Sequence, residues 1–220
     1  MKRILFYGDS NTYGYDPYTL FGGRYDETVR WTDVLALAVE DEWTVFADGQ
    51  NGRQIPRHTA DYGYAIRAIN MVTPLSVFAV MLGTNDIFSM IPHEDETNAE
   101  RVAKRMDDFL QEVLKTPAVQ ADGMRILLIA PPKMRITPDF FFGGMAEDGD
   151  PMTELSLAYR QLADARGYLF ADASSWDIDL SPDGVHLSPK GHATMAAHLE
   201  QVLRDLPPIT EGEVLSCVQT

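Results

Sequence analysis

The amino-acid sequence predicts an α/β fold, in which a five-stranded parallel sheet is covered by helices on both faces. Short runs of apolar and β-branched residues alternate with longer stretches whose apolar residues recur with helical spacing. This alternation is typical of sheets in which a crossover helix joins each parallel strand to the next. One run, VFAVML at residues 77–82, is apolar throughout, as expected of a strand that is buried on both faces.

The strands are predicted in chain order at residues 4–7, 43–47, 77–82, 126–130 and 168–171. We expect them to pair in the flavodoxin-like order 2-1-3-4-5, which gives a three-layer protein with the sheet in the middle. In such a sheet, ligands bind outside the carboxyl ends of the strands, near the switch point between strands 1 and 3. The residues that follow those strands are therefore the first candidates for a functional site.

Amphipathic stretches between the strands predict the helices. Apolar residues share one helical face in residues 102–113 and in residues 155–165. Weaker patterns predict helices at residues 31–39 and within residues 55–71. Capping signals mark several helix ends, namely Thr97 with Glu100, Gly167, and Ser188 with Pro189.

The chain of 220 residues is long enough for one α/β domain with a sizeable core, and it contains no repeat or low-complexity linker. We assign residues 1–206 to a single domain and residues 207–220 to a C-terminal tail. Two long stretches, residues 15–30 and 131–150, have no regular pattern. Loops of that length in a compact domain are usually functional, so we expect them to contribute walls to a binding site.

Composition and charge exclude several classes of protein. The net charge of −15 opposes binding to nucleic acid and to anionic membranes. The single cysteine, Cys217, excludes an internal disulfide framework and a thiolate metal cluster. The first apolar run, residues 4–7, is too short for a signal peptide, and no run is long enough to span a membrane. We therefore expect a cytoplasmic protein that binds a small molecule.

Four loops at the predicted carboxyl edge carry residues suited to acyl transfer. Ser10 follows the first strand and could act as a nucleophile, provided that a base takes its proton. His186 could be that base, and Asp183 could orient its imidazole. Gly52 and Asn85 follow the second and third strands. Their backbone N–H and side-chain amide, with the N–H of Ser10, could stabilise the oxyanion of a tetrahedral intermediate.

The same residues give the chain a resemblance to the SGNH hydrolases, also called the GDSL esterase/lipase family. The blocks that define this family appear in order as GDS, NG, GTND and DGVH. The segments KRILFYGDS, VRWTDVLA and VMLGTND resemble the small bacterial arylesterases and acyltransferases of the family. The resemblance implies the flavodoxin-like fold, the roles given above, and catalysis without a metal or organic cofactor. The chain departs from the family motif at Asn11, where the motif has leucine.

The resemblance further implies a substrate class. We expect short acyl esters, of the acetyl type, with aryl or alkyl alcohols or sugars, and acyl transfer to alcohols is a further expectation. Asn11, Tyr13 and Tyr15 lie close to Ser10 in the sequence, and Phe141 lies in the long FFFGG loop. We expect these four residues to contact the substrate. We also expect the chain to form a homo-oligomer.

Other interpretations use the same residues. Asp9, Asn85, Asp183 and His186 could instead hold two metal ions in a phosphoesterase. The crevice could also bind a small ligand without catalysis, because a fold alone does not determine function. Ser10 could simply cap a helix, whereas we interpret Asp9 as a structural acid and Asp86 as a turn residue. The presence of all four blocks, each at the end of a strand or before a helix, favours the serine esterase.

Overall fold

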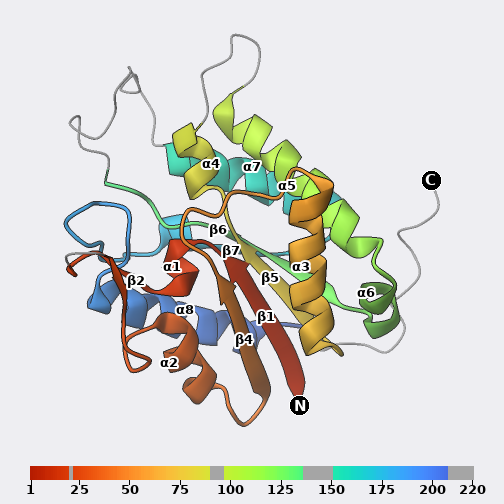
Figure 1. Ribbon diagram of the computed structural model, residues 1–220, viewed down its shortest axis with the longest axis horizontal. Coiled ribbons are helices and arrows are strands. Elements are labelled where there is room, and N and C mark those ends of the chain that lie inside the picture. The colour runs from red at the N-terminus through yellow and green to blue at the C-terminus, as the bar shows by residue number, and fades with distance from the viewer. Residues whose placement is uncertain (20–21, 90–96, 136–150, 208–220) are drawn as a thin grey trace.

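The computed structural model describes residues 1–19, 22–89, 97–135 and 151–207. Its main sheet has five parallel strands in the order β4-β1-β5-β6-β7 (Figure 1). The strands are β1 (Lys2–Gly8), β4 (Trp43–Gly49), β5 (Val77–Met81), β6 (Arg125–Ala130) and β7 (Leu169–Asp172). In the numbering of the predicted strands this order is 2-1-3-4-5, so the predicted fold class and strand order are confirmed.

Helices cover both faces of the sheet and enclose a core on each side (Figure 1). One face carries α3 (Thr59–Val72), α5 (Asn98–Leu114) and α7 (Pro151–Arg166), and the other carries α2 (Trp31–Ala38) and α8 (Pro189–Asp205). Successive side chains of β1 alternate between the two cores: Leu5 points into the first, and Ile4 and Phe6 into the second. This alternation explains why the strands read as continuous apolar runs.

The helix caps that the sequence predicts are present in the structure. Thr97 and Glu100 make a reciprocal capping box at the start of α5. The side chain of Ser188 accepts a hydrogen bond from the N–H of Gly191 at the start of α8. Gly167, directly after α7, has a φ of +68°, which favours glycine at a helix end. Within the described part of the chain, no helix is long and apolar enough to cross a membrane.

Several short elements are absent from the sequence prediction because they are too short to show periodicity. They are α1 (Ser10–Tyr13), β2 (Tyr15–Asp16), β3 (Gly23–Arg24), α4 (Thr84–Ser89), α6 (Pro117–Asp122) and a 3₁₀ turn at Ala173–Ser175. The antiparallel pair of β2 and β3 lies inside the stretch 15–30 that was expected to be irregular. Most of the second long stretch, from residue 136 to 150 and including Phe141, lies outside the described residues.

The short helix α1 packs directly on the sheet because a glycine lies beneath it. A Cβ atom built on Gly49, the last residue of β4, would lie 2.1 Å from the backbone nitrogen of Tyr13 and 2.5 Å from the carbonyl carbon of Thr12. Both contacts are far shorter than a real Cβ contact, and backbone atoms cannot rotate away. The glycine therefore allows α1, which begins at Ser10, to lie against the carboxyl end of the sheet.

We expect Gly49→Ala to lower the free energy of unfolding by about 1–3 kcal/mol, the usual cost of overpacking. Gly63→Ala is the matched control. Gly63 lies inside α3, and among the described residues no atom from outside the adjacent helix backbone lies within 4 Å of the position that a Cβ would take there. Removing an exposed helix glycine should therefore raise stability by about 0.5–1 kcal/mol. Urea unfolding of both variants checks the prediction, and a loss of stability in Gly63→Ala alone would contradict it.

Candidate active site

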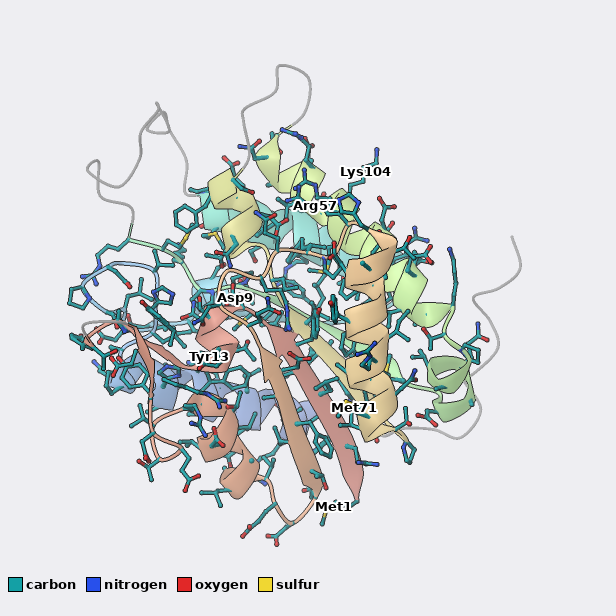
Figure 2. The ribbon with its side chains drawn as sticks, in the orientation of Figure 1. Met1, Asp9, Tyr13, Arg57, Met71 and Lys104 are labelled. Carbon is teal, nitrogen blue, oxygen red and sulfur yellow. The ribbon has the colours of Figure 1, made fainter. Side chains whose placement is uncertain are left out.

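The carboxyl ends of the central strands meet at one edge of the sheet. Gly8 pairs with Gly49 of β4 and with Met81 of β5, so these three strands end at the same level. Figure 2 shows Asp9 at this edge, where β1 passes into α1. The loop after β4 carries Gly52, and α4 after β5 carries Asn85. The predicted site residues of these three loops therefore lie along one edge.

The loop before α8 places His186 between a carboxylate and a hydroxyl. The Nδ1 atom of His186 lies 2.6 Å from Oδ2 of Asp183, and its Nε2 atom lies 2.9 Å from Oγ of Ser10. Because the carboxylate accepts the proton on Nδ1, the Nε2 atom is left to accept a proton from the hydroxyl. The structure therefore brings Ser10, Asp183 and His186 together in an arrangement that can move a proton from serine to imidazole.

Asp183 is held in its ionised form. Its Oδ1 atom accepts the N–H groups of Val185 and His186, each at 3.0 Å. Burial by itself raises the pKa of this carboxyl group, but the hydrogen bonds from the His186 ring and from the two N–H groups outweigh it and bring the pKa below its ordinary value. An ionised Asp183 stabilises a positive charge on the imidazole beside it.

Asp9, not Ser10, caps α1. The Oδ1 atom of Asp9 accepts the N–H of Asn11 at 3.0 Å, and Ser10 is the first residue of the helix. The alternative in which the hydroxyl of Ser10 serves only as a helix cap therefore does not fit the structure. The interpretation of Asp9 as a structural acid agrees with this contact. The hydroxyl of Ser10 faces His186 instead.

The sequence of the chain matches the model of the GDSL-like lipase/acylhydrolase family over residues 6–194. The chain belongs to this family. The resemblance that the sequence indicated is thereby confirmed, and the chain is a carboxylic ester hydrolase.

Solved structures of bacterial esterases share the fold of this esterase. An aryl esterase from M. smegmatis is 27% identical with a TM-score of 0.78, over 94% of this chain and 100% of that chain. A carbohydrate acetylesterase from Sinorhizobium meliloti is 26% identical with a TM-score of 0.76, over 93% of this chain and 99% of that chain. A carbohydrate acetylesterase family member from the same species is 30% identical with a TM-score of 0.75, over 93% of this chain and 98% of that chain. No curated protein sequence matches the chain significantly.

In this GDSL-family esterase, the loop after β4 rests on α4. Gly52 has a φ of +71°, and apart from its two chain neighbours no described residue has an atom within 4 Å of the place where a Cβ would be. The Nδ2 atom of Asn85 donates to the carbonyl of Arg53 at 3.0 Å. An amide group has two hydrogens, so this bond fixes Asn85 and leaves the other hydrogen for a second acceptor.

Arg53, which sequence analysis overlooked, attaches this loop to the sheet. Its Nη1 atom donates to the carbonyl of Gly8 at 2.9 Å and to the carbonyl of Asp48, and its Nη2 atom donates to Oδ1 of Asp48 at 2.7 Å. The guanidinium also lies 3.9 Å from the ring centroid of Tyr7. One side chain thus joins the end of β1, the end of β4 and the loop that carries Gly52. The position of Arg53 directly after the NG block was the available signal.

Asp86 has a larger structural role than the turn residue that the sequence suggested. Its carboxylate is fully buried and accepts the N–H of Ile55 at 2.9 Å. Arg57 and Arg105 approach it at 3.4 and 3.5 Å. Burial raises its pKa, although the Ile55 N–H and the two arginines oppose this shift. Asp86 therefore fixes the loop after β4 to the helix that carries Asn85.

The residues predicted to contact substrate have different environments. The Tyr15 ring centroid lies 4.5 Å from that of the His186 imidazole, so Tyr15 flanks the site. The Tyr13 ring packs instead against the guanidinium of Arg24, 4.7 Å away. Asn11 is only 4% exposed, and both polar atoms of its side chain bond to the loop around His186, so its predicted contact with substrate stays a prediction. Phe141 lies outside the described residues.

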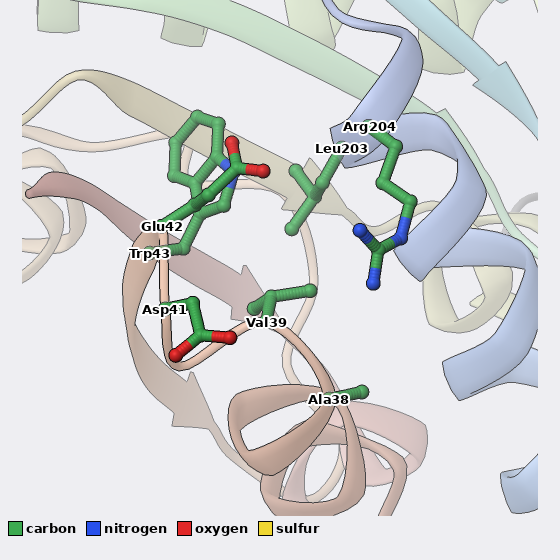
Figure 3. Close-up of a pocket in the computed structure, with 7 residues that line it drawn as sticks. All are labelled: Ala38, Val39, Asp41, Glu42, Trp43, Leu203 and Arg204. Atoms are coloured by element: carbon green, nitrogen blue, oxygen red, sulfur yellow. The ribbon is translucent and has the colours of Figure 1, made fainter.

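A hollow at the other end of the molecule is not part of this site. Figure 3 shows it beside the start of β4 and the end of α8, whereas Ser10 follows the carboxyl end of the sheet. Its lining consists of Ala38, Val39, Asp41, Glu42, Trp43, Leu203 and Arg204.

Asp9 should make the stability of the esterase depend on pH. Burial raises the pKa of Asp9 from 3.8 to about 6, against the opposing effects of the Asn11 N–H, His186 and Arg53. The native state therefore binds the proton of the Asp9 carboxyl group more tightly than the unfolded chain does. The stabilisation is therefore present below about pH 4 and is lost as the pH rises to about 6.

Asp9→Asn keeps a side-chain oxygen for the cap but cannot ionise. As the pH rises from 4.5 to 7.5, we expect the free energy of unfolding of the variant to increase relative to that of the wild type, by up to about 3 kcal/mol. Urea unfolding of both proteins at the two pH values measures this difference. An equal difference at both values would contradict the raised pKa.

Proposed function

We propose that the protein is a serine esterase that acts through an acyl-serine intermediate on Ser10. One observation carries the proposal: the His186 imidazole lies 2.6 Å from the Asp183 carboxylate on one side and 2.9 Å from the Ser10 hydroxyl on the other. A hydroxyl becomes an effective nucleophile when an oriented base can take its proton. Membership of an acylhydrolase family supports the same chemistry.

The proposed reaction has two steps. In the first, His186 Nε2 takes the proton of Ser10 as Oγ attacks the ester carbonyl, and the imidazolium then protonates the leaving alcohol. In the second, His186 takes a proton from water as the water attacks the acyl group, and the imidazolium then returns a proton to Oγ of Ser10 as the acid leaves. The N–H groups of Ser10 and Gly52 and the free amide hydrogen of Asn85 stabilise the oxyanion in both steps.

We propose short acyl groups, of the acetyl type, as the substrates' acid portion, with aryl or alkyl alcohols or sugars as the alcohol portion. The structural neighbours support this class, since they include an aryl esterase and a carbohydrate acetylesterase. Acyl transfer to an alcohol is a further proposal. The small exposed fraction of Ser10, 7%, and the Tyr15 ring beside His186 support it, because both restrict the access of water to the acyl-enzyme.

Hydrolysis of p-nitrophenyl acetate by the wild type and by Ser10→Ala, with a chelator present throughout, tests the proposal. We expect turnover in the wild type and its loss in the variant. Equal turnover in both proteins would exclude the serine mechanism. Turnover that is absent from both proteins and returns when the chelator is left out would favour a metal-dependent enzyme instead, although Asp183 and His186 bond to each other here.

A further inference from the structure

We propose that Asn11 is a positioning residue that holds His186 against Ser10; this inference rests on the proposed serine mechanism. The Nδ2 atom of Asn11 donates to the carbonyl of Val185 at 3.2 Å. Its Oδ1 atom accepts the N–H of Leu187 at 3.0 Å. One side chain, directly after the nucleophile, thus bonds to the residues on both sides of the base.

This connection matters because the two reacting groups come from opposite ends of the chain. Ser10 and His186 are 176 positions apart, and His186 lies on a loop rather than on a strand or helix. A loop residue needs a local contact to keep its side chain at a fixed distance from a partner. Asn11 supplies that contact within one residue of the nucleophile.

Asn11 is itself rigidly held. Its N–H donates to the Asp9 carboxylate at 3.0 Å, and its carbonyl accepts the indole N–H of Trp31 at 2.8 Å. Trp31 is fully buried in the core between the sheet and α2. Hydrogen bonds therefore connect the buried Trp31 to Asn11, and Asn11 to the loop that carries His186. They hold this loop, and with it the imidazole, in a fixed position relative to the core.

A leucine at this position, as in the family motif, could make neither bond. Replacing Asn11 by leucine would leave the carbonyl of Val185 and the N–H of the fully buried Leu187 without this partner. The loop would then shift, and the distance between Nε2 and Oγ would no longer be fixed. Such a displacement of about 1 Å can cost up to about 10²-fold in rate.

The test uses Asn11→Leu and Asn11→Ala, because alanine removes both bonds without adding bulk. For each protein we would measure kcat and KM with p-nitrophenyl acetate, and the rate at which a small organophosphate labels Ser10. We expect kcat and the labelling rate to fall by about 10- to 100-fold while KM stays nearly constant. Asn70→Leu, on the exposed face of α3, is the matched control and should behave as the wild type.

The same substitutions in a His186→Ala background show whether Asn11 acts through His186. We expect Asn11→Ala to reduce the labelling rate no further in that background, since the base is already absent. The proposed role would be overturned if Asn11→Ala lowered the labelling rate of His186→Ala by the same factor as it lowers that of the wild type. It would also be overturned if Asn11→Ala alone kept the wild-type kcat or changed only KM. If Ser10 of the wild type is not labelled, the serine mechanism itself fails; normal labelling in every Asn11 variant would overturn only the role of Asn11.

Discussion

His186→Ala is expected to lower kcat for p-nitrophenyl acetate by about 10⁶-fold, as the loss of the base does in other serine hydrolases. The variant loses the imidazole that lies 2.9 Å from the Ser10 hydroxyl, and with it both the acceptor of the serine proton and the proton donor to the leaving alcohol. The loss should appear in kcat rather than in KM, because His186 acts on the reacting atoms and not on the bound ester. Steady-state kinetics with p-nitrophenyl acetate measures it.

His198→Ala is the control for the histidine substitution. His198 lies on the exposed side of α8, where its ring stacks on Trp176 at 4.6 Å, so its removal should leave kcat unchanged. Added imidazole should restore part of the activity of His186→Ala only. A kcat for His186→Ala within about tenfold of the wild type, where loss of a catalytic base costs orders of magnitude, would show that His186 is not the base.

Asn85→Ala is expected to lower kcat by about 10²–10³-fold, the usual cost of one oxyanion donor. The hydrogen bond from Nδ2 to the carbonyl of Arg53 orients the amide of Asn85 before substrate binds. The donor therefore contributes where negative charge develops in the transition state, and KM should change little.

Asn85→Asp separates the donor from the shape of the side chain. Aspartate has nearly the same size as asparagine but has no N–H to donate, and its charge repels an oxyanion. We expect its kcat to fall at least as far as that of Asn85→Ala. Wild-type kcat in either variant would remove Asn85 from the oxyanion site, and a rise in KM alone would make it a substrate contact.

The sequence predicted what depends on local patterns. The buried strands produce apolar runs, and Asp183 and His186 are close enough in the chain for their pairing to be inferred. The placement of Ser10 and Asn85 at strand ends followed from the topology of a parallel sheet. These features require only periodicity, spacing and strand order.

The remaining parts of the site depend on contacts between distant segments. Arg53 bonds to Gly8, and Asp86 accepts the N–H of Ile55 from another loop. The side chain of Asn11 bonds to Val185 and Leu187, on both sides of His186, which the sequence did not indicate. No local pattern encodes these pairs, because each joins residues on separate elements.

The central claim is that Ser10 carries the acyl group, and acid-quenched mass spectrometry tests it most directly. The wild type would be mixed with p-nitrophenyl acetate, quenched within the first turnovers and digested. We predict one acetyl group on the peptide that contains Ser10, and none on that peptide from Ser10→Ala. Turnover without this modification, or an acetyl group that persists on the same peptide of Ser10→Ala, would contradict the claim.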